Sequence, residues 1–251
     1  FITQPVVHCH LEPISTVATW DNNGKLTMWI GTMWLHGTRM ELAEILEMPI
    51  SKIRMISAYA GGTFGNRQSV LWPYPIAALL SKKARRPVCV INTREEEFMT
   101  TRHRGRSRIW MKMGAKKDGT ITALHAKWLL DNGAYTYLVR MLQTYSCIRS
   151  DAVYRFTNTK WEAKLAYTNS CPTANFRGYG SAQPTFAREQ LMYMLAEKLN
   201  MDPAELRLKN SHKSGDVNLH GWDIGSCGLS ECIHENVRKS GWTEKRAKKK
   251  F

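Results

Sequence analysis

The chain has 251 residues, of which 43% are hydrophobic and 23% are charged, so it can bury one large core or two smaller ones and is not intrinsically disordered. It contains no run of about eighteen apolar residues and no secretory signal, which argues against a membrane span and predicts a cytoplasmic protein. Its formal net charge of +15 favours an acidic partner, a phosphorylated cofactor or nucleic acid.

The positions of the basic residues and of the cysteines limit which partners and which metal sites are consistent with the sequence. The densest basic runs, at residues 82–86, 102–108 and 245–250, lack interleaved aromatic residues, so solvated surfaces are the simpler interpretation. The six cysteines form no Cys-x-x-Cys pair, so we expect reduced thiols and neither a zinc site nor an iron–sulfur cluster. The chain begins with Phe1 rather than Met, which we interpret as a segment taken from a longer polypeptide.

The N-terminal part of the sequence predicts a hairpin followed by a helix. The β-prone residues 14–20 and 25–31 flank Asp-Asn-Asn-Gly, a composition typical of hairpin reversals. Apolar positions at helical spacing predict a helix over residues 35–47, and Thr38 with Glu41 would form its capping box.

The next elements alternate between strand and helix. Residues 52–59 are apolar and β-branched and predict a strand. The pattern of residues 70–80 predicts a helix with Pro73 and Pro75 near its start, where proline is tolerated. Residues 87–92 predict a buried strand.

The second half of the sequence predicts a long hairpin and a group of helices. Residues 106–114 and 120–130 are strand-like on either side of Lys-Lys-Asp-Gly, and residues 160–168 return to strand composition. Residues 133–149 show no clean periodicity and predict no regular element. Helices are predicted over residues 182–199, over residues 203–210 with Pro203 at the start, and over residues 229–239 with an end at Gly241.

These elements predict the fold class. Strands and helices alternate irregularly and several strands pair as hairpins, which favours an α+β fold with mixed sheets and packed helices. A doubly wound parallel sheet would require regular alternation, which the sequence does not show.

A glycine-punctuated segment, residues 60–68, reads Ala-Gly-Gly-Thr-Phe-Gly-Asn-Arg-Gln and lies between a predicted strand and a predicted helix. Its glycines let the backbone turn tightly and approach a bound group, and its amide N–H groups can face an anion. It matches neither the Gly-x-Gly-x-x-Gly motif nor the Gly-Lys-Ser/Thr phosphate motif. A ligand-binding loop and a plain connecting turn are both consistent with this segment.

A second punctuated segment spans residues 169–180. Both segments combine aromatic rings with arginine, at Phe64, Arg67, Phe176, Arg177 and Tyr179. Arginine offers a planar fork for a phosphate, and an aromatic ring can hold a flat substrate by stacking. The two segments are therefore interpreted either as one site for an anionic, planar ligand or as two surface turns with chance arginines.

The two segments resemble the molybdenum hydroxylases, the family of xanthine dehydrogenase and aldehyde oxidase. The similarity lies in Gly-Gly-Thr-Phe-Gly-Asn-Arg-Gln at residues 61–68, in Ala-Tyr-Thr-Asn-Ser-Cys-Pro at residues 166–172 and in Phe-Arg-Gly-Tyr-Gly-Ser-Ala-Gln at residues 176–183. Further similar motifs follow the family's order at residues 10–13, 86–88, 93–96, 118–120 and 201–210. The resemblance is to the large, molybdenum-binding subunit and covers nearly the whole chain.

This resemblance implies that residues 1–251 are the first molybdopterin-binding domain, a fragment of a longer subunit. In the family, molybdenum held by molybdopterin inserts water-derived oxygen into a C–H bond of an N-heterocycle or aldehyde, and electrons pass through iron–sulfur clusters to FAD. The expected cofactor is molybdopterin, in its mononucleotide or dinucleotide form. The expected partners are a C-terminal molybdopterin-binding domain, iron–sulfur and FAD subunits or domains, and a small-molecule substrate, in an oligomer without nucleic acid or membrane.

The resemblance also assigns roles to individual residues. The loop beside the cofactor would be Gly62, Thr63, Phe64 and Gly65, and Arg177 would contact the cofactor. The substrate would contact Phe64, Gln68 and Tyr179. No residue of the chain would ligate the metal, because the pterin supplies the ligands. The glutamate general base of the family is expected on a C-terminal part beyond this sequence, so no catalytic residue is expected within it.

Several positions depart from the family's pattern. Met33 stands where many relatives have Gln near the pterin, and Thr63 replaces a glycine. Gln68 and Tyr145 stand where purine-oxidising members have Glu and Arg. The arginines nearest to the latter position are Arg140 and Arg149. These departures and the missing general base leave open a catalytically silent binding or structural module of the same fold, and the net charge of +15 leaves open a basic nucleic-acid-binding domain.

Overall fold

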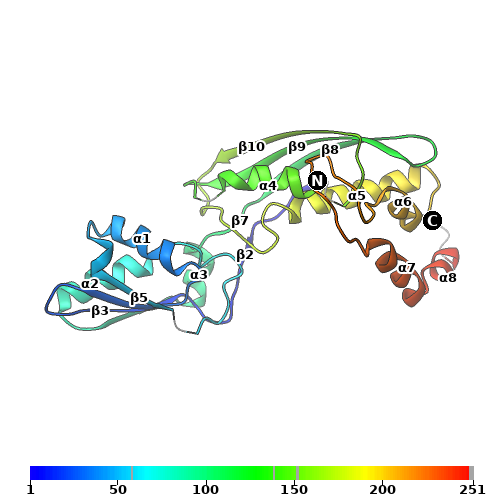
Figure 1. The fold of residues 1–251 in the computed structure, drawn as a ribbon. Helices are drawn as coiled ribbons and strands as arrows, with labels where there is room; N and C mark the ends of the chain where they lie inside the picture. Colours follow the sequence, from blue (N-terminus) through cyan, green and yellow to red (C-terminus); the bar gives the residue numbers. More distant parts are fainter. Residues whose placement is uncertain (58, 138, 151–152, 249–251) are drawn as a thin grey trace.

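A computed structural model describes residues 1–57, 59–137, 139–150 and 153–248 of the chain. It shows two lobes, each with a four-stranded sheet and packed helices (Figure 1). The first lobe is formed mainly by residues 14–92 and the second mainly by residues 107–210. The mixed sheets with packed helices confirm the predicted α+β fold. Each lobe buries its own hydrophobic cluster, so the core is divided in two.

The sheet of the first lobe begins with the predicted N-terminal hairpin. Its strands, β3 (Ser15–Trp20) and β4 (Leu26–Ile30), pair antiparallel. The 3-10 turn η1 (Ile50–Lys52) leads into β5 (Ile53–Ser57), which pairs parallel with β4. The last strand, β6 (Val88–Ile91), pairs antiparallel with β3, which gives the order β5-β4-β3-β6.

Two helices, α1 (Leu35–Ile45) and α2 (Pro73–Ala84), pack against this sheet (Figure 1). The buried cluster between sheet and helices includes Met28, Leu42 and Tyr74. The helix α2 begins at Pro73, three residues after the start of the predicted pattern, and Pro73 and Pro75 lie in its first turn as predicted, where a missing N–H costs nothing.

Two predictions for the first lobe are wrong in detail. The helix α1 begins at Leu35, so Thr38 lies inside it and donates to the carbonyl of Trp34 at 2.8 Å instead of capping its start. The carboxylate of Glu41 accepts from the backbone N–H of Val70, a partner far away in the sequence. The predicted buried strand β6 lies at a sheet edge, and its Ile91 is 62% exposed.

The second lobe is built on the predicted long hairpin, β8 (Ser107–Ala115) and β9 (Ile121–Gly133). The strand β10 (Asn158–Tyr167) pairs parallel with β9, and β1 (Ile2–Thr3) pairs antiparallel with β8. The order is β1-β8-β9-β10, so the N-terminal residues of the chain complete the sheet of the second lobe.

Helices cover one face of this sheet (Figure 1). Two of them, α5 (Ala182–Lys198) and α6 (Pro203–Asn210), agree with the predicted helices. The third, α4 (Arg140–Ser150), was not predicted, because its segment has no clear apolar periodicity. The buried cluster beneath these helices includes Leu124 and Trp128.

The connection between the lobes contains short elements. The strand β2 (Val6–Val7) pairs antiparallel with β7 (His103–Arg104). The helix α3 (Arg94–Thr100) begins with a capping box in which Thr93 accepts from the N–H of Glu96 and the Glu96 carboxylate accepts from the N–H of Thr93. This Thr-x-x-Glu pattern is a local signal of a helix start, although no helix was predicted at this position.

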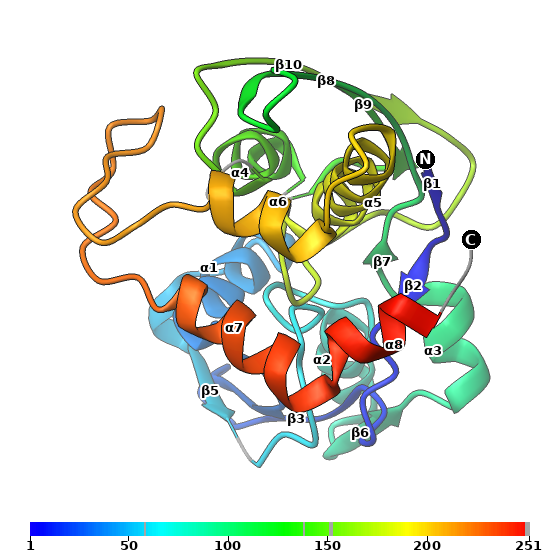
Figure 2. The ribbon, with the colours of Figure 1, turned by 90° about the vertical axis from the view of Figure 1, so that its right-hand side faces the viewer.

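The chain ends in two helices, α7 (Leu229–Ser240) and α8 (Trp242–Lys248), after a narrow loop that extends away from the second lobe (Figure 2). As predicted, α7 stops at Gly241, which has a left-handed φ of 63°. No residue of α7 is buried. The basic run predicted at residues 245–250 lies partly in α8, and residues 249–251 lie outside the described residues.

Three further properties bear on function. None of the helices in the described residues is long and apolar enough to cross a membrane. Within the same residues, no group of three or more His, Cys, Asp or Glu side chains is placed to hold a metal ion. Cys9, Cys89, Cys171, Cys227 and Cys232 are free thiols, as expected.

Candidate functional site

The two glycine-punctuated segments meet at one cavity of about 610 Å³, which is lined from both lobes. We call residues 60–68 the first loop and residues 169–180 the second loop. The predicted site residues that line the cavity are Thr63, Phe64, Gly65, Gln68, Arg177 and Tyr179. The other lining residues are Met33, Met141, Tyr145, Arg149, Asn175, Phe176 and Gly178.

The two loops contact each other through their backbones. The N–H of Arg177 donates to the carbonyl of Phe64 at 2.8 Å. Gly65 has a φ of 110°, and a Cβ atom there would lie 2.6 Å from the carbonyl oxygen of Asn175. Gly65 therefore lets the first loop approach the second loop, which differs from the expectation that the glycines let the backbone approach a ligand.

Two other positions of the first loop are also conformationally special. Phe64 has a left-handed φ of 45°, which is unusual for a residue with a side chain, and the residue is 45% exposed and lines the cavity. Gly62 does not line the cavity, and a Cβ atom there would lie 2.8 Å from the Cβ of His10. Gly62 thus permits close packing behind the loop.

Arg67 does not present its charge to a ligand. Its side chain is completely buried, and its Nη1 lies 3.1 Å from Oε2 of Glu12. Its Nη2 donates to the carbonyls of Glu12 and Pro13 at 2.7 and 3.2 Å. The expectation that each loop offers a ring and a free cation is therefore wrong for the first loop.

Phe176 is held within the protein on one side. Its ring stacks on that of His8, with centroids 4.2 Å apart and planes at 24°, and the guanidinium of Arg104 lies 4.6 Å from its centroid. The ring anchors the second loop, so the rings offered to a planar ligand are those of other lining residues. Gln68 is also engaged, since its side-chain oxygen accepts from the amide of Asn175.

The helix α4 supplies the remaining wall of the cavity, through Met141, Tyr145 and Arg149. The Tyr145 and Tyr179 rings form an edge-to-face pair with centroids 5.5 Å apart. The guanidinium of Arg149 lies over the Tyr145 ring at 4.5 Å and donates to the carbonyl of Tyr179 at 2.7 Å. The four-residue spacing of 141, 145 and 149 was the signal that could have revealed this helix face.

The electrostatic character of the cavity is cationic. The Arg177 side chain is exposed at the cavity, and among the described residues no carboxylate pairs with it. The lining residues include no carboxylate and no imidazole. Burial raises the pKa of Tyr179 to about 12, so its phenol stays protonated at neutral pH. The cavity can bind an anionic, flat group, and its lining residues offer no proton acceptor.

The chain is similar in sequence to a known protein family and to individual members of it. The family model described as "Molybdopterin cofactor-binding domain" matches residues 1–211. The xanthine dehydrogenase molybdenum-binding subunit of Escherichia coli O157:H7 is 33% identical over 246 residues, which cover 98% of this chain and 33% of that subunit. The nicotinate dehydrogenase large molybdopterin subunit of Eubacterium barkeri is 34% identical, over 96% of this chain and 56% of that subunit.

Solved structures share the fold. The aldehyde oxidoreductase of Desulfovibrio gigas superposes with a TM-score of 0.92 at 30% identity, over 100% of this chain and 28% of that enzyme. The quinoline 2-oxidoreductase of Pseudomonas putida 86 also gives a TM-score of 0.92, at 25% identity, over 98% of this chain and 32% of that protein. The chain thus spans about a third of the length of most of these relatives.

Proposed function

Because the chain belongs to the molybdopterin cofactor-binding domain family, we propose that residues 1–251 form the first molybdopterin-binding domain of a molybdenum hydroxylase. The coverage supports this proposal, since the chain matches only part of each longer relative. The relatives are described as molybdenum-binding or molybdopterin subunits, which supports an assembly with iron–sulfur and FAD subunits or domains and with a second molybdopterin-binding domain.

The residues at the cavity fit a molybdopterin group. The backbone N–H groups of Thr63, Phe64 and Gly65 have no protein acceptor within the described residues, so they can donate to an anionic ligand. The exposed guanidinium of Arg177 lies at the same cavity and offers paired hydrogen bonds to a phosphate. When bound, the molybdenum cofactor would supply the centre at which water-derived oxygen is inserted into a C–H bond.

The aromatic wall would orient the substrate. The rings of Phe64, Tyr145 and Tyr179 line the cavity, and such rings hold a planar N-heterocycle or an aromatic aldehyde by stacking or edge contact. Because the lining residues hold no carboxylate, a general base would come from outside this chain. We propose that this base is the glutamate expected on a C-terminal part of the subunit.

The single observation that carries the proposal is the meeting of the two loops at one cationic, aromatic cavity. To test it, the native assembly that contains this chain would be purified from cells grown with ample molybdate and analysed for molybdenum and pterin. About one molybdenum per chain, with oxidation of an N-heterocycle or aldehyde, is expected. An assembly that carries neither molybdenum nor pterin would instead favour the silent module of the same fold.

A further inference from the structure

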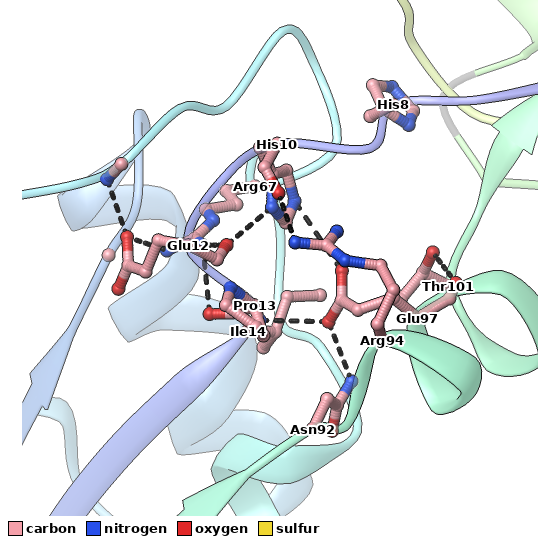
Figure 3. A network of polar contacts seen from close by, with 12 residues as sticks. His8, His10, Glu12, Pro13, Ile14, Arg67, Asn92, Arg94, Glu97 and Thr101 are labelled. Atoms are coloured by element: carbon pink, nitrogen blue, oxygen red, sulfur yellow. Dashed lines mark hydrogen bonds and ion pairs between the residues drawn. The ribbon is translucent and has the colours of Figure 1, made fainter.

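The segment between β2 and β3 reaches both loops of the cavity from behind. Figure 3 shows His8, His10 and Glu12 on this segment, with Arg67 of the first loop and Glu97 of α3 close by. His8 and His10 are 6% and 1% exposed. Neither His8 nor Glu12 lines the cavity, so each would influence a ligand only through the loops.

Glu12 holds the two ends of the first loop. Its Oε2 accepts from the N–H of Gly61 at 2.6 Å and lies 3.1 Å from Nη1 of the buried Arg67. Its carbonyl accepts from Arg67 as well, at 2.7 Å. The approach is close enough to require glycine, because a Cβ atom at Gly61 would lie 2.5 Å from the Cβ of Glu12. One side chain thus fixes where the first loop begins and where it ends.

His8 holds the second loop. Its Nε2–H donates to the carbonyl of Asn175 at 2.7 Å, and its ring stacks on Phe176. The carbonyl of the next residue, Arg177, accepts from Arg104, whose guanidinium also lies over the Phe176 ring. The backbone of the second loop is therefore fixed just before the residue whose guanidinium reaches the cavity.

The segment between His8 and Glu12 is itself fixed. Arg94 donates from Nη2 to the carbonyls of His10 and Leu11, at 2.8 and 2.9 Å. His10 donates from Nδ1 to the carbonyl of Glu12 at 2.6 Å, and its Nε2 lies 3.7 Å from Oε2 of the buried Glu97. Since its backbone is bound at several points, the segment cannot lengthen or shorten freely between the two loops.

We infer that His8 and Glu12 are positioning residues that set the spacing between the two loops. They thereby keep the Arg177 guanidinium and the N–H groups of the first loop at a separation at which one anionic ligand can contact both. The loops contact each other directly at two points, from the Arg177 N–H to the carbonyl of Phe64 and from the Asn175 amide to the side-chain oxygen of Gln68. The segment joins them at two more. The inference rests on the proposed function for the identity of that ligand, whereas the positioning itself can be measured without it.

The first experiment measures amide hydrogen exchange in the purified protein. Glu12→Gln removes the charge that pairs with buried Arg67, so the hydrogen-bonded N–H groups of the first loop, those of Gly61 and Asn66, should exchange faster by about tenfold or more. Glu189→Gln is a matched control, because Glu189 is 29% exposed and pairs with the buried Arg188, as Glu12 is 30% exposed and pairs with Arg67. The control should leave residues 60–68 unchanged.

A second pair of variants separates the two contacts of His8. His8→Phe keeps a ring for Phe176 but cannot donate to Asn175, whereas His8→Gln can donate and cannot stack. Each variant should speed exchange in residues 169–180 by a few-fold, with little change in residues 60–68. Unchanged exchange in both loops for Glu12→Gln and both His8 variants would overturn the inference.

The link to the ligand is tested by molybdenum and pterin content in the native assembly. Glu12→Gln should lower both by about threefold or more, and Glu189→Gln should not. If the wild-type assembly contains molybdenum and Glu12→Gln loosens the first loop yet keeps full molybdenum and full kcat/KM, the positioning role is wrong. If the wild-type assembly contains no molybdenum, the proposed function fails, and the exchange rates alone decide whether His8 and Glu12 position the loops.

Discussion

Arg177 combines a fixed backbone with a free side chain. Its N–H donates to Phe64 and its carbonyl accepts from Arg104, while its guanidinium is exposed at the cavity. A substitution of the side chain should therefore leave the second loop in place. This separation makes Arg177 suitable for testing the cofactor contact that the family resemblance assigns to it.

We expect Arg177→Lys to lower molybdenum content in the native assembly. Lysine keeps the charge but loses the planar fork, and each hydrogen bond to a charged partner contributes about 1.5–3 kcal/mol. Elemental analysis of the purified assembly gives the content per chain. Full molybdenum together with full turnover in Arg177→Lys would contradict the role assigned to this residue.

Tyr179 is expected to act on the substrate instead. Its ring lines the cavity and pairs edge-to-face with Tyr145. Tyr179→Ala should raise KM or lower kcat with molybdenum near the wild-type content, since a lost ring no longer positions a planar substrate. Tyr179→Phe is the control and should stay close to wild type. A loss of molybdenum in Tyr179→Ala as complete as that in Arg177→Lys would refute the distinction.

His8 gives the protein a pH-dependent stability. Burial lowers the pKa of His8 from 6.5 to about 4, so the unfolded chain takes up this proton first as the pH falls. The free energy of unfolding should therefore decrease from about pH 6.5 down to about pH 4, by about 3 kcal/mol in total for this residue. Urea unfolding at pH 7 and pH 4.5 measures the change. His8→Phe does not titrate, so its stability should fall less over the same range.

Asp202 links two helices of the C-terminal part. Its side chain caps α6, where Oδ1 accepts from the N–H groups of Ala204 and Glu205 at 2.7 and 3.4 Å. Its Oδ2 accepts from Trp242 of α8 at 2.9 Å and lies 3.3 Å from Nε of Arg246. The exposed helix α8 thus depends on a residue that also starts α6.

Removal of this carboxylate should have two separable effects. Asp202→Ala should lower the free energy of unfolding by about 1–2 kcal/mol through the lost cap, as measured by urea unfolding. Asp202→Asn can still cap α6 through its Oδ1, but the NH2 group that replaces Oδ2 cannot accept from Trp242, so stability should change less. In both variants trypsin should cut near Arg246 faster than in wild type. An Asp202→Asn protein cut at the wild-type rate would show that Asp202 does not hold α8.

The cavity is formed only where the two lobes meet, because its lining residues come from both lobes. Each lobe has its own hydrophobic cluster, and the lining residues come from both, so the relative position of the lobes determines the shape of the cavity. The sequence permitted one core or two, and only long-range packing decided between them. The connection between the lobes includes β2, β7 and the segment that carries His8 and Glu12.

For the isolated chain we expect no bound molybdenum and no turnover. The lining residues offer no proton acceptor, and the matched relatives are much longer, so other segments would complete the contacts around the cofactor. Elemental analysis of the chain expressed alone with ample molybdate provides the measurement. Stoichiometric molybdenum in that preparation would show that this chain suffices to hold the cofactor.

The sequence by itself determined the elements whose signals are local. The hairpin of β3 and β4 follows from an Asp-Asn-Asn-Gly turn, α6 from Pro203 at its first position, and the end of α7 from Gly241. The two loops were also visible, because glycine, aromatic and arginine residues are grouped within a few positions. These features depend on neighbouring residues, which a linear sequence places side by side.

Only the tertiary structure decided which side chains of those loops face the cavity. Arg67 is buried against Glu12 and Phe176 stacks on His8, and these partners lie 55 and about 168 positions away in the sequence. The same holds for the parallel pairing of β4 with β5 and for the face that α4 turns to the cavity. Such contacts depend on how distant segments pack, and burial and hydrogen bonding are determined only once those segments meet.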